Sequence, residues 1–594
     1  MEKWRVELYD TPLWLLQTFL GVMMLGVLLV FGLRKTNFGE QFYRIVHPCL
    51  TGKNILKISL LLGLILILLL LEVRFSVLNT FFYNGLYSSL EKKDLSAFWF
   101  FALLNAILLV VRIINGVTKQ WFEEVLQIRW LETLNETLIV RWLSDNQYYR
   151  LQMQQESLDS THGIDNIDQR IQQDAQDFIE ITVTFFLGMV DSITSTIEYA
   201  IVLWGLSGVL VIFEIHIPKG MVFFVFIFVV LATVGAMWIG KPLIALNFAN
   251  EKLNGNYRYD LIRIKDNAES IAFYQGERFE FAHLKHSFNQ IIANRWQIVF
   301  RTLGLNSFNN GLTQGVQLLP LMLQAPRFFA GQATIGDMHQ TVQAFNRLQR
   351  ALSFFRNFYE TFTDYRARLN RLSGFLKSTQ QSHPTTHPTF YEYEQGLKLQ
   401  NVTLYRPTGE ILLENVNINI NNGDKLLIQG QSGCGKTSLL RALAGLWMFG
   451  SLGDVYRPNM NHIMFIPQKP YLPQGSLKQA ICYPNITVQD DELIQTMQAC
   501  HLGYMTTHLQ KTENWSQKLS VGEAQRIAFV RLLLCQPKLV LMDESTSGLD
   551  ETIEASLYKI MNQRLPNTCV VSVGHRNTLL KFHNQFLVLP AQSY

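Results

Sequence analysis

The chain has 594 residues, of which 48% are hydrophobic and 12% aromatic, and its formal net charge at pH 7 is only +4. This length exceeds that of one ordinary domain, and the apolar content is typical of a polytopic membrane protein rather than a soluble enzyme. The sequence contains no basic block and no aromatic-basic stripe, so nucleic acid is not expected as a partner.

Long apolar runs in the first half of the chain predict helices that cross a lipid bilayer. The four clearest runs are 13–33, 55–71, 97–111 and 221–239. Three candidates with polar residues bring the expected count to about seven: 181–213, 297–323 and 333–350. A cleaved signal peptide is the alternative for 13–33, but the flank lacks a small-x-small cleavage site and the first ten residues are mixed in charge, which favours an uncleaved span.

Basic residues predict how these helices are oriented. The loop after the first run contains Arg34, Lys35, Arg44, Lys53 and Lys57, and lysine and arginine are enriched in cytoplasmic loops. Six spans are expected between this loop and the C-terminal domain, and an even number of spans puts both on the same side of the membrane. If the C-terminal domain is cytoplasmic, the loop is cytoplasmic too. The two arguments agree, and they leave the N-terminus outside.

Two polar stretches with helical composition, 118–175 and 241–295, separate the spans and are expected to extend the membrane helices into the cytoplasm. The segment 377–396 is expected to be a linker, because its first part is polar and interrupted by prolines. His383 and His387 lie four residues apart in this linker, but the proline between them breaks the helical face that a metal site would use. Metal binding is therefore not expected there.

A phosphate-binding loop follows at 430–437, between the apolar segment 424–429, which predicts a strand, and 438–445, which predicts a helix. Its glycines let backbone N–H groups converge on phosphate oxygens, and Lys436 can reach the terminal phosphates of a nucleotide. The helix N-terminus also faces the phosphates. The nucleotide-binding residues expected here are Gly430, Gln431, Ser432, Gly433, Cys434, Gly435, Lys436, Thr437 and Ser438.

Further polar side chains end or follow the strands predicted at 462–466, 539–544 and 570–573. Asp543 suits the coordination shell of Mg²⁺, and Glu544 is placed to orient or deprotonate the attacking water. Gln468 and His575 each come just after a strand, from which they can project toward a γ-phosphate. The predicted catalytic residues are Glu544, His575 and Gln468, and the predicted Mg²⁺ ligands are Thr437, Gln468 and Asp543.

From about Leu397 to its C-terminus the chain resembles an ABC nucleotide-binding domain, because these elements occur in order with Leu519-Ser520-Val521-Gly522-Glu523. The resemblance implies further nucleotide contacts from Ser520 and Gly522 of the signature and from Asp550. Tyr405 lies where the family often stacks an aromatic ring on adenine, although a tyrosine at a strand edge is the alternative. Val521 and Gly548 depart from the commonest pattern and are expected to tune turnover. Only Cys49 of the six cysteines precedes this cytoplasmic domain, so disulfides are not expected.

The resemblance implies that the signature of one ATPase domain completes the site of another. Because the chain carries one phosphate-binding loop and one signature, we expect a homodimer with two composite sites for ATP and Mg²⁺. The expected fold class is an α-helical polytopic membrane domain of the exporter-type ABC fold fused to an α/β P-loop ABC ATPase domain. The expected boundaries are an extra first helix and loop at 1–54, a six-helix transmembrane domain at 55–376, the linker 377–396 and the nucleotide-binding domain 397–594.

The membrane half resembles the BacA/SbmA-related transporters and their peroxisomal fatty-acid relatives. The resemblance rests on 148–151 and 165–174, where Ile167 replaces a common proline, and on 250–254, 267–277 and 324–331, which resemble the ATPase-bearing BacA-like subgroup. It implies a lipid-embedded protein of the bacterial inner (cytoplasmic) membrane, with its ATPase domain in the cytoplasm. It also implies uptake of hydrophilic cargo, such as cobalamin or peptides.

Two polar stripes within the predicted spans support that expectation. Such faces are costly in lipid, so they line water or bind neighbouring helices. The residues predicted to line a cargo cavity are Asp191, Glu198, Asn306, Asn310, Thr313, Gln314 and Gln317. The alternatives are transport of fatty acids or acyl-CoA, which predicts an apolar entrance with a basic collar, and a membrane ATPase that regulates without moving cargo. The sequence fixes neither the cargo nor the direction of transport.

Overall fold

The computed structural model describes residues 3–50, 54–157, 167–207, 209–212, 215–380 and 388–590. The chain forms two compact units. One contains Met1–Tyr149 with Ile164–Gln381, and the other contains Arg150–Gly163 with Ser382–Tyr594. Asp165 and Asn166, on which part of the family resemblance rests, lie outside the described residues, as do His383 and His387 of the linker.

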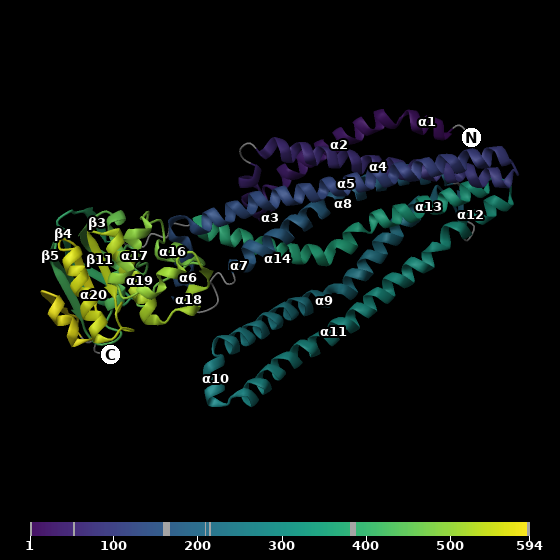
Figure 1. Cartoon of the computed structure of the whole chain (residues 1–594). Coiled ribbons are helices and arrows are strands. Elements are labelled where there is room, and N and C mark those ends of the chain that lie inside the picture. Colours follow the sequence, from purple (N-terminus) through teal and green to yellow (C-terminus); the bar gives the residue numbers. More distant parts are fainter. Residues whose placement is uncertain are drawn as a thin grey trace. The chain divides into compact units, whose positions relative to one another are not determined.

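The first unit is built from long helices. Three of them, α4 (Asn54–Glu91), α5 (Leu95–Leu143) and α8 (Ala175–Leu206), lie alongside one another (Figure 1). Asp94 allows the turn between α4 and α5, because its carboxylate accepts hydrogen bonds from the backbone N–H groups of Ser96 and Ala97, both at 3.1 Å. The other α-helices of this unit up to the end of α8 are α1 (Lys3–Tyr9), α2 (Thr11–Leu33), α3 (Asn37–Val46) and α7 (Ile167–Gln169), whereas α6 (Gln147–Ser157) belongs mostly to the second unit.

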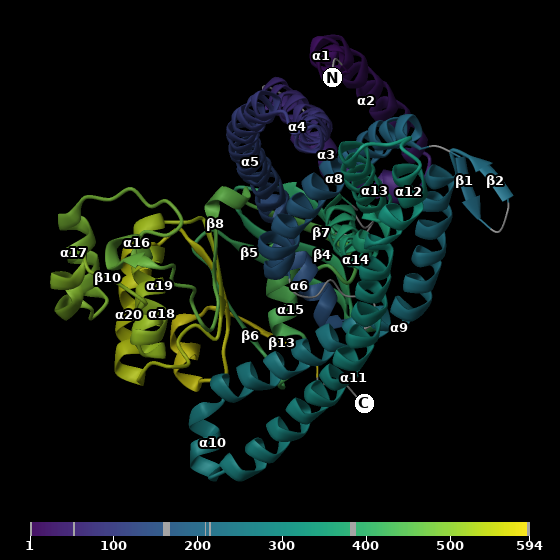
Figure 2. The same cartoon turned by 90° about the vertical axis from the view of Figure 1, so that its right-hand side faces the viewer.

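Within the described residues, five helices are long and apolar enough to cross a membrane. They are Thr11–Leu33, Ile55–Glu91, Leu95–Met153, Ile167–Leu206 and Gly220–Asp266. They include the expected spans 13–33, 55–71, 97–111 and 221–239. The expected span 181–213 ends earlier, because α8 stops at Leu206 and β1 (Val209–Ile212) pairs antiparallel with β2 (Ile215–Pro218) beyond it (Figure 2).

The expected count of seven spans is not confirmed, because the candidates 297–323 and 333–350 are too polar to meet this criterion. Both are nevertheless helical. The first contains the end of α11 (Glu277–Gln317) and the start of α12 (Leu319–Phe329), and the second lies in α13 (Ile335–Leu352). One face of α13 is fully buried against α4 and α8, which explains how a helix of mixed composition is held within the bundle.

A long helical hairpin confirms that residues 241–295 are helical. Helices α9 (Gly220–Asp266) and α11 pack along each other, and the short α10 (Ala268–Tyr274) lies at the tip (Figure 1). Gly235 permits their close approach, because a Cβ there would lie only 2.7 Å from the ring of Phe308. The unit ends with α14 (Phe354–Gln380), which occupies the first residues of the expected linker.

The described part of the second unit contains a five-stranded parallel sheet in the order β13-β6-β12-β11-β8. Its strands are β6 (Lys425–Gln429), β8 (Ile463–Ile466), β11 (Leu539–Asp543), β12 (Cys569–Val573) and β13 (Gln585–Val588). The strands predicted from the sequence at 424–429, 462–466, 539–544 and 570–573 are thus confirmed, although β11 ends at Asp543 and Glu544 lies beyond it. A second sheet has the order β3-β7-β4-β5. Its strands are β3 (Thr389–Glu392), β4 (Gly396–Tyr405), β5 (Ile411–Asn421) and β7 (Ser451–Arg457).

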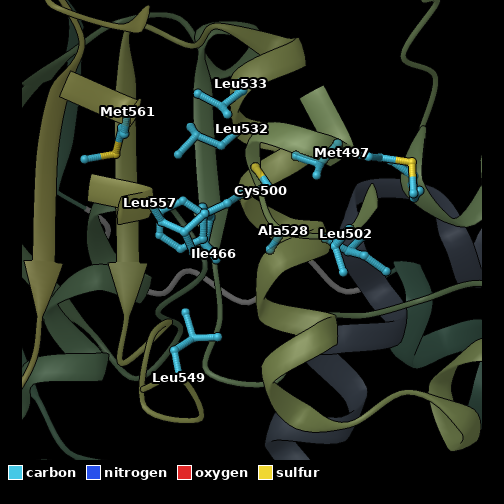
Figure 3. Packing of buried hydrophobic residues seen from close by; sticks show 14 of the residues in the cluster. Ile466, Met497, Cys500, Leu502, Ala528, Leu532, Leu533, Leu549, Leu557 and Met561 are labelled. Carbon is cyan, nitrogen blue, oxygen red and sulfur yellow. The ribbon is translucent and has the colours of Figure 1, made fainter. Parts of the chain in front are cut away.

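The parallel sheet is covered on both faces, as its apolar strands require. Val540 and Met542 of β11 belong to one buried cluster, and Leu539 and Leu541 belong to another, because successive side chains of a strand point to opposite faces. Figure 3 shows the first cluster, to which helices α19 (Val521–Cys535) and α20 (Glu551–Arg564) contribute Leu532, Leu557 and others. The remaining elements are α15 (Lys436–Leu443), α16 (Leu477–Ile481), α17 (Asp490–Ala499), α18 (Trp515–Lys518), β9 (Gly475–Ser476) and β10 (Thr512–Glu513).

Candidate functional site

The phosphate-binding loop joins the end of β6 to the start of α15, as predicted. Gly433 and Gly435 have φ angles of +85° and +99°, which L-residues with a side chain rarely adopt. Gly435 is the N-cap of α15, so the unpaired N–H groups of the first helical turn open toward the loop. The loop is therefore shaped to receive phosphate oxygens.

Lys436 is the buried cation of this loop. Its Nζ donates hydrogen bonds to the carbonyl oxygens of Gly430, at 2.8 Å, and Gln431, at 2.9 Å. The ammonium is thus held across the loop by neutral carbonyl groups alone, without a carboxylate partner among these contacts. A phosphate oxygen is a stronger, charged acceptor, so the arrangement suits a polyphosphate ligand.

Thr437 and Asp543 meet at the carboxyl end of β11. The hydroxyl of Thr437 donates to Oδ1 of Asp543 over 3.1 Å. Burial raises the pKa of Asp543, and the nearby Glu544 adds to the rise, whereas the bond from Thr437 opposes it. A divalent cation would favour the ionised form, and this hydroxyl–carboxylate pair fits Mg²⁺.

Three predicted catalytic side chains converge just beyond β11. Nε2 of Gln468 donates to Oε2 of Glu544 over 3.1 Å, and Nε2 of His575 lies 3.4 Å from Oε1 of the same carboxylate. Glu544 has a φ angle of +44°, which is uncommon for a residue with a side chain and often marks a functional position. Gln468, a predicted Mg²⁺ ligand, thus contacts Glu544, while Thr437 and Asp543 contact each other.

The signature residues lie at the start of α19. Ser520 caps this helix, and its hydroxyl donates to Oε2 of Glu523 over 2.8 Å. Among the described residues, no hydrogen bond joins Ser520 or Gly522 to the loop 430–437, and Ser520 is exposed. Because Ser520 is exposed, it is accessible to a nucleotide that is bound by another chain.

Asp550 and Tyr405 occupy the ends of two elements. Asp550 caps α20, and the hydrogen bond from the backbone N–H of Ile553, at 2.8 Å, lowers the pKa of its carboxyl. Tyr405 ends β4, and its carbonyl accepts a hydrogen bond of 3.1 Å from the indole of Trp447. Its ring is only partly buried, so the stacking role remains a prediction.

Sequence reasoning missed Gln525, a fully buried residue that connects three functional segments. From α19, its Nε2 donates to the carbonyl of Gln468 over 2.9 Å and to the hydroxyl of Ser547 over 3.3 Å. Its Oε1 accepts from the backbone N–H of Gly548 over 3.0 Å. Its position two residues after Glu523 was the available clue, but a glutamine in a helix does not by itself predict a buried side chain.

Arg576, next to His575, makes a similar connection. Its guanidinium donates to the carbonyls of Leu549, at 2.7 Å, and Ser547, at 2.9 Å, and to the buried carboxylate of Glu554, at 3.1 Å. The segment carrying His575 is therefore tied to the segment that ends at Asp550.

The amide stripe predicted in the membrane half lies on one face of α11. Asn306, Asn310, Thr313 and Gln314 are exposed, whereas Leu305 packs close to Gly240 of α9. The stripe thus faces away from the hairpin partner in a single chain. The side chain of Gln317 lies outside the described residues.

The two predicted carboxylates of α8 have different surroundings. Glu198 accepts a 2.6 Å hydrogen bond from the indole of Trp14 and lies 3.5 Å from the guanidinium of Arg74, which also pairs with Glu7 at 2.7 Å. Its contacts therefore reach the N-terminal helices. Asp191 instead lines a cavity of about 330 Å³ between α4, α5, α8 and α13.

Fold and site together define a P-loop ATPase joined to a helical membrane region. The family model described as "ABC transporter transmembrane region 2" matches residues 45–329, and the model described as "ABC transporter" matches residues 413–547. An uncharacterized ABC transporter ATP-binding protein of Haemophilus influenzae is 51% identical over 587 residues, which cover 99% of this chain and 98% of the relative. The chain belongs to the ABC transporter family.

Two further relatives indicate the range of this similarity. The inner membrane ABC transporter ATP-binding protein YddA of Escherichia coli is 29% identical, with 90% of this chain and 95% of the relative covered. The human lysosomal cobalamin transporter ABCD4 is 25% identical, with 92% and 94% covered. The expected fold class and the expected coupling of ATP hydrolysis to transport are confirmed: the protein is a membrane-bound ABC half-transporter with an ATP-binding domain.

Proposed function

We propose that two copies of this chain form a homodimer in the bacterial inner membrane, which uses ATP and Mg²⁺ to take up hydrophilic solutes such as cobalamin or peptides. The observation that carries the cargo class is the charged cavity beside Asp191, within helices that are otherwise apolar. The exposed amides of α11 add polar surface within the same unit. The assignment to the ATPase-bearing BacA-like subgroup of the family is also a proposal, and it is supported by the segments 250–254, 267–277 and 324–331.

In this proposal the chain's own residues divide the work of hydrolysis. Backbone N–H groups of the loop and Lys436 bind the phosphates, and Thr437 and Asp543 would hold Mg²⁺, which supplies charge neutralisation when bound. Glu544 orients the attacking water and accepts its proton, while Gln468 and His575 fix the Glu544 carboxylate through the contacts described above. Ser520 and Gly522 of a second copy complete each site.

Replacing Glu544 with Gln tests the catalytic assignment. The isosteric amide cannot accept the proton, so hydrolysis should fall by about 10²–10⁴-fold while ATP binding remains. Turnover and nucleotide affinity are measured on the purified full chain. Wild-type turnover in this variant would refute the assignment.

The composite site is tested by mixing two inactive variants. Lys436→Ala disables the loop and Ser520→Arg disables the signature, so each variant alone should not hydrolyse ATP. A dimer of one copy of each variant retains one intact site. If the two sites act independently, this mixed dimer should have at most about half of the ATPase activity of a wild-type dimer. Normal hydrolysis by either variant alone would contradict a site shared between two copies.

Transport is tested in ATP-loaded proteoliposomes with labelled cobalamin, a basic peptide and an acyl-CoA. ATP-dependent movement of cobalamin or the peptide, absent in Glu544→Gln, supports the proposal. Movement of acyl-CoA alone would favour the acyl-chain alternative. Hydrolysis without movement of any of the three would favour a regulatory ATPase.

A further inference from the structure

The cavity beside Asp191 contains charges of both signs. Its lining includes the carboxylates of Glu72, Glu123 and Asp191 and the cations Lys119 and Arg347. They come from four helices, of which α4, α5 and α8 are apolar enough to cross a membrane. Charged side chains within such helices are costly and usually mark the path or binding site of a solute or ion.

Part of this charge is compensated within the protein. Nζ of Lys119 lies 2.6 Å from the carboxylate of Glu72 and 3.9 Å from that of Glu123. The side chain of Lys119 is only 19% exposed, so solvent screens these contacts weakly. Lys119 thus joins α4 to α5, and its single positive charge compensates one of the two carboxylates.

Asp191 and Arg347 lie near enough to interact across the cavity, but neither makes an ion pair among the described residues. Asp191 accepts a hydrogen bond of 3.3 Å from Ser195, but no ion pair joins it to a cation among the described residues. Arg347 likewise makes neither an ion pair nor a side-chain hydrogen bond there. Both are partly buried, and a partly buried charge needs a compensating group. The two face one cavity without pairing with each other.

Tyr199 supplies a third polar group in this cavity. Its side chain is 1% exposed, and its hydroxyl has no hydrogen-bond partner. Ser76 also lines the cavity and lies near enough to influence the hydroxyl, but without the geometry of a hydrogen bond. Buried polar groups nearly always have a partner, so this hydroxyl is available to a polar group that enters the cavity.

We propose that this cavity binds a small zwitterionic solute of about dipeptide size, with its ammonium group at Asp191, its carboxylate at Arg347 and a polar group at the Tyr199 hydroxyl. The volume of about 330 Å³ lies at the lower end of the range for small-molecule sites. A solute with two opposite charges satisfies both residues at once, whereas a single ion leaves one of them unpaired. The site rests on the proposed function and narrows its cargo to solutes with both charges.

The experiment uses the full chain in lipid nanodiscs and the labelled dipeptide alanyl-alanine, measured by equilibrium dialysis. Two analogues each lack one charge: N-acetyl-alanyl-alanine has no ammonium group, and alanyl-alanine amide has no carboxylate. Each should bind about ten- to a hundredfold more weakly than the dipeptide, because it loses one charged hydrogen bond.

Variants then assign each end of the dipeptide to one residue. Asp191→Asn should weaken binding of the dipeptide by about ten- to a hundredfold but leave binding of the N-acetyl analogue unchanged. Arg347→Gln should also weaken binding of the dipeptide by about ten- to a hundredfold, but it should leave binding of the amide analogue unchanged. Tyr199→Phe should weaken binding by about fivefold. Arg129→Gln is the control, because Arg129 is an exposed arginine on α5, one of the cavity helices, and does not line the cavity, so this change should have no effect.

Equal affinity for the dipeptide and both analogues would overturn the proposal, as would unchanged binding in Asp191→Asn and Arg347→Gln. If a variant fails to fold, the ranking of the analogues on the wild-type protein decides. Uptake of cobalamin without dipeptide binding would overturn this site alone. Charge-dependent binding without ATP-dependent uptake of any hydrophilic solute would support the site and overturn the transport proposal.

Discussion

The buried carboxylate of Glu554 holds two nucleotide-site segments together, and its replacement with Gln is a sensitive test of that arrangement. Glu554 is 0% exposed and accepts hydrogen bonds from Arg576 at 3.1 Å, Thr546 at 3.0 Å and Thr578 at 3.3 Å. The amide has the same size but no charge, and it offers one acceptor oxygen instead of two. The change therefore preserves packing and alters only the charge and the hydrogen bonding of this side chain.

Two lost interactions determine how far the free energy of opening of α20 should fall. The bond from Arg576 changes from charged to neutral, which costs about 1 kcal/mol, since the arginine side chain is 36% exposed and partly screened. One donor also loses its acceptor oxygen, which costs about another 1 kcal/mol. The free energy of opening helix α20 should therefore fall by about 2 kcal/mol, which corresponds to an exchange rate about thirtyfold higher.

Hydrogen–deuterium exchange of the full chain measures this opening in peptides from α20 and from 574–579. Peptides from β4 and β5 should be unchanged. Glu551→Gln is the control, because Glu551 lies on the same helix and is exposed, and it should have little effect. Exchange in Glu554→Gln that equals wild type or the control would refute the argument.

Three further changes test other parts of the molecule. Gln525→Leu leaves the backbone N–H of Gly548 without its partner, so ATP turnover should fall about tenfold, with nucleotide affinity retained in a binding titration. Arg74→Met removes the partner of Glu198, so limited proteolysis near the N-terminus should be faster, and unchanged cleavage would contradict this. Burial lowers the pKa of His583, so the folded state binds fewer protons than the unfolded chain, and stability should be lost as the pH falls below about 6.5. The drop in melting temperature between pH of about 8 and 5.5 should be smaller in His583→Gln.

The sequence by itself predicted most of the nucleotide site. The loop 430–437, the strand before Asp543 and the signature are contiguous segments, and their function depends on local backbone geometry that residue type already indicates. The parallel sheet could also be predicted, because its strands are short, apolar and separated by helical segments. The roles of Glu544, His575 and Gln468 remain proposals, but the structure brings their side chains together.

The tertiary structure decided the connections between segments. Gln525 and Arg576 contact residues 22 to 57 positions away, and nothing in their local sequence indicates those partners. It also separated Asp191 from Glu198, which share one helical face in sequence but meet different neighbours, Glu198 at the N-terminal helices and Asp191 in the cavity.

Sequence periodicity identifies the polar face of a helix, whereas packing of four helices places Asp191, Tyr199 and Arg347 around one cavity. The number of membrane spans stays a prediction for a related reason. Part of the polar surface of α13 and α11 is accommodated against other helices or left on an exposed face, so composition alone could not say whether lipid or protein surrounds them. Local chemistry was therefore determined by the sequence, and the pairing of distant side chains was determined by the fold.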